Sequence, residues 1–121
     1  MARNYKNIVA WQRSHEFVLV VYQLTAKFPD AERFGLTSQL RRAAVSVPAN
    51  IAEGSVRDSH IDYLRFLTIA LGSLSEVDYF LFLFNDLGYV AEERYVELQE
   101  QITRAFAALH GLIKAVKSDN R

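Results

Sequence analysis

Five polar residues recur along one stretch of the chain at a spacing that places them on one side of an α-helix. Their separations are three, four, four and three residues, and they are Gln39, Arg42, Ser46, Asn50 and Glu53. Amide, hydroxyl and guanidinium groups suit directed hydrogen bonds. We therefore expect this polar stripe to form a structural hydrogen-bond network or a subunit interface. The alternative is an ordinary solvent-facing side of the helix.

One carboxylate, Glu76, lies in the middle of a long apolar segment. If Glu76 is buried it needs a partner, because an unpaired buried charge is costly. Arg41 and Arg42 carry guanidinium groups in the neighbouring segment. We expect one of the two to reach Glu76.

The residues that most often support catalysis or bind metals form no recognisable set. None of His15, His60 and His110 has a carboxylate three residues before it, so the Glu-x-x-His pair of di-iron bundles is absent. The five glycines are scattered and make no phosphate-binding loop. No feature singles out a Ser-His-acid triad. We predict no enzymatic activity, no metal and no cofactor.

Four aromatic residues lie close together in the chain: Tyr79, Phe80, Phe82 and Phe84. Aromatic rings can stack on the bases of single-stranded nucleic acid, but such sites interleave them with basic residues. No basic residue lies between these four. We therefore expect them to pack in a core or an interface.

Four predicted helices position these residues, over about residues 8–28, 37–53, 60–87 and 92–117. Asn7 is the expected cap of the first helix, Thr37 or Ser38 that of the second, and Ser59 with Asp62 that of the third. Helices joined by short connectors predict an all-α fold, an up-down-up-down antiparallel four-helix bundle.

Pro48 stands inside the second predicted helix, where proline removes a backbone hydrogen bond and costs about 3 kcal/mol. We expect a kink at Pro48, because the polar stripe keeps its phase across this residue. Two short helices, with Pro48 in the first turn of the second, are the alternative. Gly54 is expected to end the helix.

The third predicted helix is apolar on nearly every side. One bundle core covers only one side of a helix, so the other side needs a second surface. Gly72 and Ser73 are small and would let a neighbouring helix approach closely. We therefore predict a homo-oligomer. The longest charge-free stretches, 66–75 and 79–85, are shorter than the roughly 20 apolar residues that span a bilayer, so we expect no membrane association.

Basic residues gather at one end of the predicted bundle. There the second helix ends, the third begins and the fourth ends, which brings together Arg57, Arg65, Lys114 and Lys117. Repeated around a ring of subunits, such charges would form a rim that holds a phosphate backbone. The alternative is simple complementarity to the helix dipoles.

Three segments carry a family resemblance. They read LTSQLRR at 36–42, SVPANIAEGS at 46–55 and ALGSL at 70–74, the last followed by Glu76. In these words the chain resembles the 23S rRNA-intervening-sequence proteins, a bacterial four-helix-bundle family. That family is similar in fold to the accessory protein of diversity-generating retroelements, which binds nucleic acid and a reverse transcriptase. The resemblance implies a pentamer and a partner that is nucleic acid or a nucleic-acid enzyme.

Composition limits the remaining choices. The 121 residues fit a single domain over 1–121, and with no cysteine there is no thiol or disulfide chemistry. The N-terminus has no signal-peptide pattern, so we expect a cytoplasmic protein. Net charge is zero, which argues against strong undirected binding of polyanions. Two function classes remain: an oligomeric scaffold that contacts RNA, single-stranded nucleic acid or a nucleic-acid enzyme, and an oligomeric protein–protein adaptor.

Overall fold

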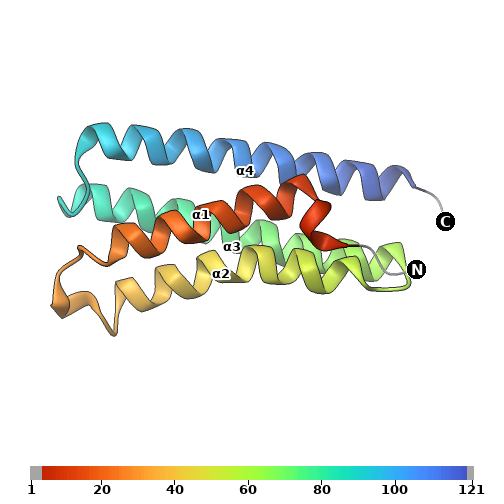
Figure 1. Cartoon of the computed structure of the whole chain (residues 1–121), viewed down its shortest axis with the longest axis horizontal. Coiled ribbons are helices and arrows are strands. Elements are labelled where there is room, and N and C mark those ends of the chain that lie inside the picture. The colour runs from red at the N-terminus through yellow and green to blue at the C-terminus, as the bar shows by residue number, and fades with distance from the viewer. Residues whose placement is uncertain (1–3, 120–121) are drawn as a thin grey trace.

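The structure is a computed structural model that describes residues 4–119, most of which are helical (Figure 1). Its elements in chain order are the short 3-10 helix η1 (Tyr5–Asn7), α1 (Val9–Thr25), the short 3-10 helix η2 (Asp30–Glu32), α2 (Leu36–Ser55), α3 (His60–Asp86) and α4 (Glu92–Ser118). The described residues contain no strand. The prediction of an all-α fold with four long helices is confirmed.

The four long helices lie side by side as a bundle (Figure 1). One end of the molecule holds the α1–α2 and α3–α4 connections, and we call it the connector end. The other end holds the α2–α3 turn with the first and last described residues, and we call it the terminal end. Large apolar side chains from α2, α3 and α4 are completely buried between the helices, among them Leu40, Ile51, Leu67, Phe84, Leu98 and Leu109. Burying each such side chain contributes about 1.5–3 kcal/mol.

The first helix begins and ends differently from the sequence prediction. Asn7 belongs to η1, and the N-cap of α1 is Ile8, whose side chain cannot cap. At the other end α1 stops at Thr25 instead of Phe28. The amide of Phe28 bonds back only three residues, to the Thr25 carbonyl at 3.1 Å. Pro29 follows directly, and the residue before a proline avoids helical conformation.

The second helix starts at Leu36, and its N-cap is Gly35. Thr37 and Ser38, the two predicted caps, therefore lie within its first turn, and the prediction of a side-chain cap here is wrong. The first backbone bond within the turn runs from the Gln39 amide to the Gly35 carbonyl at 3.0 Å. The start of α2 is thus left without a capping side chain.

Pro48 is buried inside α2, which is one continuous helix and not two short ones. A bend of the helix axis at Pro48 stays a prediction. Gly54 does not end the helix as predicted, because α2 continues to Ser55. Its role is close packing on α3: a Cβ added to Gly54 would lie 2.8 Å from Phe66 Cβ and 3.0 Å from Tyr63 Cδ1.

The third helix begins as predicted, with the Ser59 hydroxyl accepting a hydrogen bond of 3.1 Å from the Asp62 amide. After it, Gly88 takes a φ of 79°, a conformation that favours glycine. The two connections then meet at the connector end, where the Tyr89 hydroxyl donates to Glu32 Oε2 at 2.9 Å. This hydrogen bond to a carboxylate, more than burial, raises the pKa of Tyr89 above its ordinary value of 10.0.

By length and composition, α3 is apolar enough to cross a membrane. Short charge-free stretches do not by themselves exclude a membrane span, because a span tolerates an occasional charge. The core helix of a soluble bundle meets the same test, and α3 buries one face among the other helices. The absence of membrane association stays a prediction.

Candidate interaction surfaces

The middle of the polar stripe forms a hydrogen-bonded link between α2 and α3. Asn50 Nδ2 donates to the Ser46 carbonyl at 2.8 Å and to Ser46 Oγ at 3.0 Å. Ser46 Oγ in turn shares a hydrogen bond of 2.8 Å with Ser73 Oγ. Because Ser46 Oγ accepts from Asn50, its own proton is free for Ser73. All three side chains are half-buried, and the link joins the two helices midway along the stripe.

One turn before this link, Arg42 pairs with Glu76 across the same two helices. The Arg42 Nη2 to Glu76 Oε2 distance is 3.6 Å. Of the two expected partners, Arg42 therefore reaches Glu76, but Glu76 is not buried. The side chains of Arg42 and Glu76 are 66% and 41% exposed, so water screens the pair. The condition of a buried Glu76 is therefore not met in the single chain, where α3 presents this position to the edge of the bundle.

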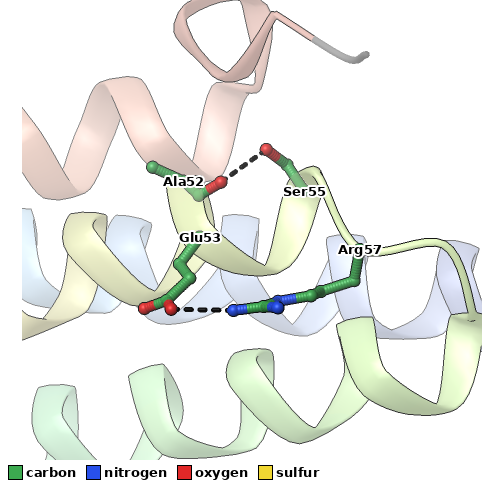
Figure 2. Close-up of polar contacts among 4 residues, drawn as sticks. All are labelled: Ala52, Glu53, Ser55 and Arg57. Carbon is green, nitrogen blue, oxygen red and sulfur yellow. Dashed lines mark hydrogen bonds and ion pairs between the residues drawn. The ribbon is translucent and has the colours of Figure 1, made fainter. Parts of the chain in front are cut away.

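The two ends of the polar stripe take no part in the α2–α3 link. Gln39 is exposed near the start of α2. At the other end Glu53 Oε1 accepts from Arg57 Nη2 at 2.8 Å, which Figure 2 shows as Arg57 reaching back along the α2–α3 turn. Nearby, in the last turn of α2, Ser55 donates to the Ala52 carbonyl at 2.7 Å (Figure 2). The stripe is therefore one network in its middle and separate surface contacts at its ends.

Arg41, one position before Arg42, is held on the other side of α2. Its Nε donates to Thr25 Oγ1 at 2.8 Å, and its guanidinium carbon lies 4.5 Å from the centroid of the Tyr22 ring. Thr25 also donates to the Val21 carbonyl at 2.7 Å. Sequence reasoning missed this contact of α1 with α2, because nothing in the spacing of Thr25 marks it as a partner.

The four basic residues predicted as a nucleic-acid contact fall into two kinds at the terminal end. Arg57 is tied to Glu53 and lies 4.7 Å from the centroid of the Phe66 ring. Arg65 pairs with Asp62 at 3.4 Å. Lys114 and Lys117 are exposed, and neither forms an ion pair within residues 4–119. The uncompensated positive charge here is thus that of the two lysines.

The outer side of α3 is exposed at a regular spacing of four and three residues. We call it the α3 outer stripe; it consists of Ile61, Arg65, Thr68, Gly72, Ser75, Tyr79, Phe82 and Asp86. Ile61, Tyr79 and Phe82 are 75%, 58% and 52% exposed. Gly72 stands at its centre, and a Cβ added there would meet nothing within 4 Å. Among the four predicted aromatics, Phe80 and Phe84 are in the core, while Tyr79 and Phe82 face outward.

The histidines make separate local contacts. His15 stacks on Trp11 with ring centroids 4.9 Å apart, and His110 stacks on Phe106 at 6.2 Å. His60 Nε2 lies 3.4 Å from Asp119 Oδ2, which connects the start of α3 to the end of α4. Within the described part of the chain, no three histidine or carboxylate side chains gather where a metal could bind.

Comparison with known proteins places this arrangement in a family. The profile of the 23S rRNA-intervening sequence proteins matches residues 6–111. The fold is similar to the crystal structure of a protein of unknown function from the S23 ribosomal protein family of Bacteroides thetaiotaomicron. The two share 28% sequence identity and a TM-score of 0.81, over 92% of this chain and 99% of the other. No curated protein matches. The chain therefore belongs to the 23S rRNA-intervening sequence protein family.

Proposed function

We propose that this protein is a non-enzymatic, homo-oligomeric scaffold in the cytoplasm that contacts nucleic acid or a nucleic-acid enzyme. The observation that carries the proposal is the α3 outer stripe. Neither the family description nor that of the structural neighbour names an enzymatic activity. The polar network of α2 and α3 supports the same proposal, since it stiffens the helix pair that presents the stripe.

A repeat of four and three residues is the spacing with which helices pack along a seam. Along the α3 outer stripe the large apolar residues flank small ones, Gly72 and Ser75. A second helix could therefore approach closely at the centre of the stripe and bury the rings of Tyr79 and Phe82 on the way. Removing this apolar surface from water on assembly would contribute about 25 cal/mol for each Å² that is buried.

A second copy of the chain fits this stripe better than lipid does. Arg65 and Asp86 stand within the stripe, and Glu76 lies beside it. Among these charges, Glu76 stands near the middle of α3, and a helix face in contact with lipid tails would have to bring it into hydrocarbon, at about 2.5–3.5 kcal/mol for a charge near the bilayer centre. A protein partner can pair them instead. The family resemblance favours five copies, so we propose a pentamer.

Gly72→Lys tests assembly with little risk to the subunit fold, since the position is open in the single chain. Gly111→Lys is the matched control, because Gly111 on α4 is equally open and lies outside the stripe. Multi-angle light scattering at micromolar concentration should give an oligomer for the wild type and Gly111→Lys, and a monomer for Gly72→Lys. Circular dichroism checks that all three keep their helices. A monodisperse wild-type monomer would refute the proposal.

The nucleic-acid part of the proposal is supported by Lys114 and Lys117, which are exposed and form no ion pair within residues 4–119. In a ring of parallel subunits the two lysines would repeat around one rim, and weak contacts would add by multivalency. A protein–protein adaptor is the second candidate. It is favoured by the zero net charge and by the carboxylates that hold Arg57 and Arg65.

A further inference from the structure

A groove of about 530 Å³ lies at the connector end, between the end of α1 and the start of α2. Three arginines line it, and no carboxylate does. Two aromatic rings and a buried hydroxyl complete the set that matters here, which is Arg33, Arg41, Arg42, Tyr22, Phe34 and Thr37. The end of α1 and the start of α2 lie at the opposite end of the bundle from the last turns of α4 (Figure 1), which hold Lys114 and Lys117.

Thr37 provides a polar group that is unused by the fold. The residue is only 6% exposed, and its Oγ1 has no hydrogen-bond partner among residues 4–119. The buried hydroxyls of Ser14 and Thr25 each donate to a carbonyl four residues back at 2.7 Å, and that of Ser55 donates to one three residues back at 2.7 Å. An unpartnered buried hydroxyl costs about 1–3 kcal/mol, so a ligand that bonds to it would recover that free energy.

The start of α2 adds hydrogen-bond donors to the same place. Its N-cap is Gly35, which has no side chain to accept from the first turn. The first backbone bond of the helix is donated by Gln39, so the amides of residues 36–38 come before it and lack a helical acceptor. Thr37 and Ser38 are in this turn and line the groove. Free amides and the positive end of the helix dipole favour an anion.

The arginines and rings of the groove are arranged in pairs. The Arg33 guanidinium lies 5.2 Å from the centroid of the Phe34 ring, and that of Arg41 lies 4.5 Å from the centroid of Tyr22. Arg41 is also fixed by its bond to Thr25. Phe34 is 88% exposed, more than any other large apolar residue that the structure describes. Rings and guanidinium planes beside a basic groove are the surfaces on which the bases of single strands stack.

Two carboxylates reduce the positive charge without cancelling it. Glu76 lies 3.6 Å from Arg42, in a water-exposed pair. Glu32 lies near Gly35, where its Oε1 would be 3.6 Å from an added Cβ, and its other oxygen accepts from Tyr89. Arg33 and Arg41 have no carboxylate partner among the described residues. The groove therefore keeps a positive excess around an open start of a helix.

We propose that this groove binds single-stranded nucleic acid. One phosphate is held by the first amides of α2 and the arginines, and the adjoining base stacks on Phe34. The Thr37 hydroxyl, which is buried in the unbound chain, reaches the phosphate once its side chain rotates toward the groove. This inference rests on the proposed contact with nucleic acid and is tested by variants of the groove alone, separately from the terminal lysines and from assembly. It gives the connector end a role that the sequence prediction assigned only to the terminal end.

The test uses a fluorescein-labelled 12-nucleotide oligouridine and fluorescence anisotropy at low salt. Phe34→Ala should weaken binding by about tenfold, as expected for the loss of one stacked base. Arg33→Gln should lower the slope of log affinity against log salt by about 0.7, the loss of one phosphate contact. Arg94→Gln is the control, because it removes the same charge from the same end of the bundle but outside the groove. It should leave the salt slope unchanged and the affinity within twofold of wild type.

Thr37→Val separates binding from folding. The substitution keeps the shape and removes a hydroxyl without a partner, so the melting temperature should stay the same or rise while affinity falls severalfold. Thr103→Val, on the exposed side of α4, is its control and should not change affinity. A lower melting temperature with unchanged affinity would show that the hydroxyl serves the fold and would overturn its role in binding.

Other outcomes separate the groove from the proposed function. In one outcome the wild type binds oligouridine, the three groove variants bind it equally well, and reversal of Lys114 and Lys117 abolishes binding. The groove is then not the binding site, and the proposed function stands. The three groove variants are Phe34→Ala, Arg33→Gln and Thr37→Val. If the wild type does not bind at low salt, both are overturned and the groove is left to a protein partner. If uridine monophosphate competes as strongly as the unlabelled 12-mer, a free nucleotide is the ligand and the strand is not. A photo-crosslink from 4-thiouridine to the peptide containing Phe34 would support the strand directly.

Discussion

The ion pair of Arg42 and Glu76 shows how exposure sets the energy of a contact. Removing one partner of a buried pair costs about 3–5 kcal/mol, which is what a buried Glu76 would imply. In the structure both side chains are well exposed, and water and salt screen their attraction. Exposed pairs contribute about 0.2–1 kcal/mol. The pair therefore tunes the α2–α3 contact and does not hold it together.

We predict that Arg42→Ala and Glu76→Gln each destabilise the protein by less than about 1 kcal/mol, with a coupling energy of about 0.2–0.5 kcal/mol. Urea unfolding of the two single variants and the double variant measures the coupling. A cycle of Arg42 with Glu100 is the control and should be additive, since Glu100 pairs with Arg104 on α4. A fall of 3 kcal/mol or more in the free energy of unfolding would mean that the pair is shielded from water in the native protein, for example within a subunit interface.

Single residues also show what spacing predicts and what it does not. The chain's own period identified Ser46 and Asn50 as network members, because both lie on one side of α2. It did not identify Ser73, since the hydrogen bond between Ser46 and Ser73 depends on how α3 slides along α2. That register follows from packing in the core. For the same reason, spacing alone could not decide whether Arg41 or Arg42 reaches Glu76.

At the scale of helices, the sequence predicted the presence of each helix better than the residues at which it begins and ends. The sequence predicted all four helices, yet the N-caps of α1 and α2 are Ile8 and Gly35, residues without a capping side chain. Capping rules favour Asn7, Thr37 and Ser38, but tertiary packing outweighs a cap that is worth about 1 kcal/mol. The uncapped start of α2 is also what sequence rules could not mark as a candidate site. It became visible only when Arg33 and Arg41 were placed around it.

Gly54 lets α2 pack closely on α3, and it offers a second test. Alanine is the better helix former by about 1 kcal/mol, but its Cβ would lie 2.8 Å from Phe66 Cβ. We predict that Gly54→Ala lowers the free energy of unfolding by about 1–3 kcal/mol, because the α2–α3 contact must open. Urea or thermal unfolding measures the change.

Gly111→Ala is the control for Gly54→Ala. Its added methyl meets nothing within 4 Å, so only helix propensity acts and the protein should be more stable by about 0.5–1 kcal/mol. Opposite signs for the two variants would establish close packing at Gly54. Stabilisation by both would show that Tyr63 and Phe66 adjust easily and that Gly54 is not required for the contact.

At the scale of the whole molecule, zero net charge conceals an uneven distribution. Arg57, Arg65 and Arg104 each lie within 4.0 Å of a carboxylate on the same segment. Among the basic residues that form no ion pair within residues 4–119, Lys114 and Lys117 lie at one end, and Arg33 and Arg41 lie at the other. Composition gives only the sum, so neither end could be ranked above the other before the pairs were known. A strand that contacts both ends would run along the length of the bundle.

Reversal of the terminal lysines tests whether that end contributes. We predict that Lys114→Glu with Lys117→Glu reduces affinity for a 12-nucleotide oligouridine by tenfold or more at low salt, and lowers the salt slope by about 1.4, which is two phosphate contacts. Assembly should persist, since both side chains point to solvent beyond most of the core. Arg13→Glu with Arg104→Glu changes the total charge equally on exposed positions away from both ends, and serves as control. Equal losses in the two double variants would mean that binding follows overall charge alone. A loss confined to the lysine variant would place strand contact at the terminal end, and if Phe34→Ala weakens binding as well, both ends contribute to binding.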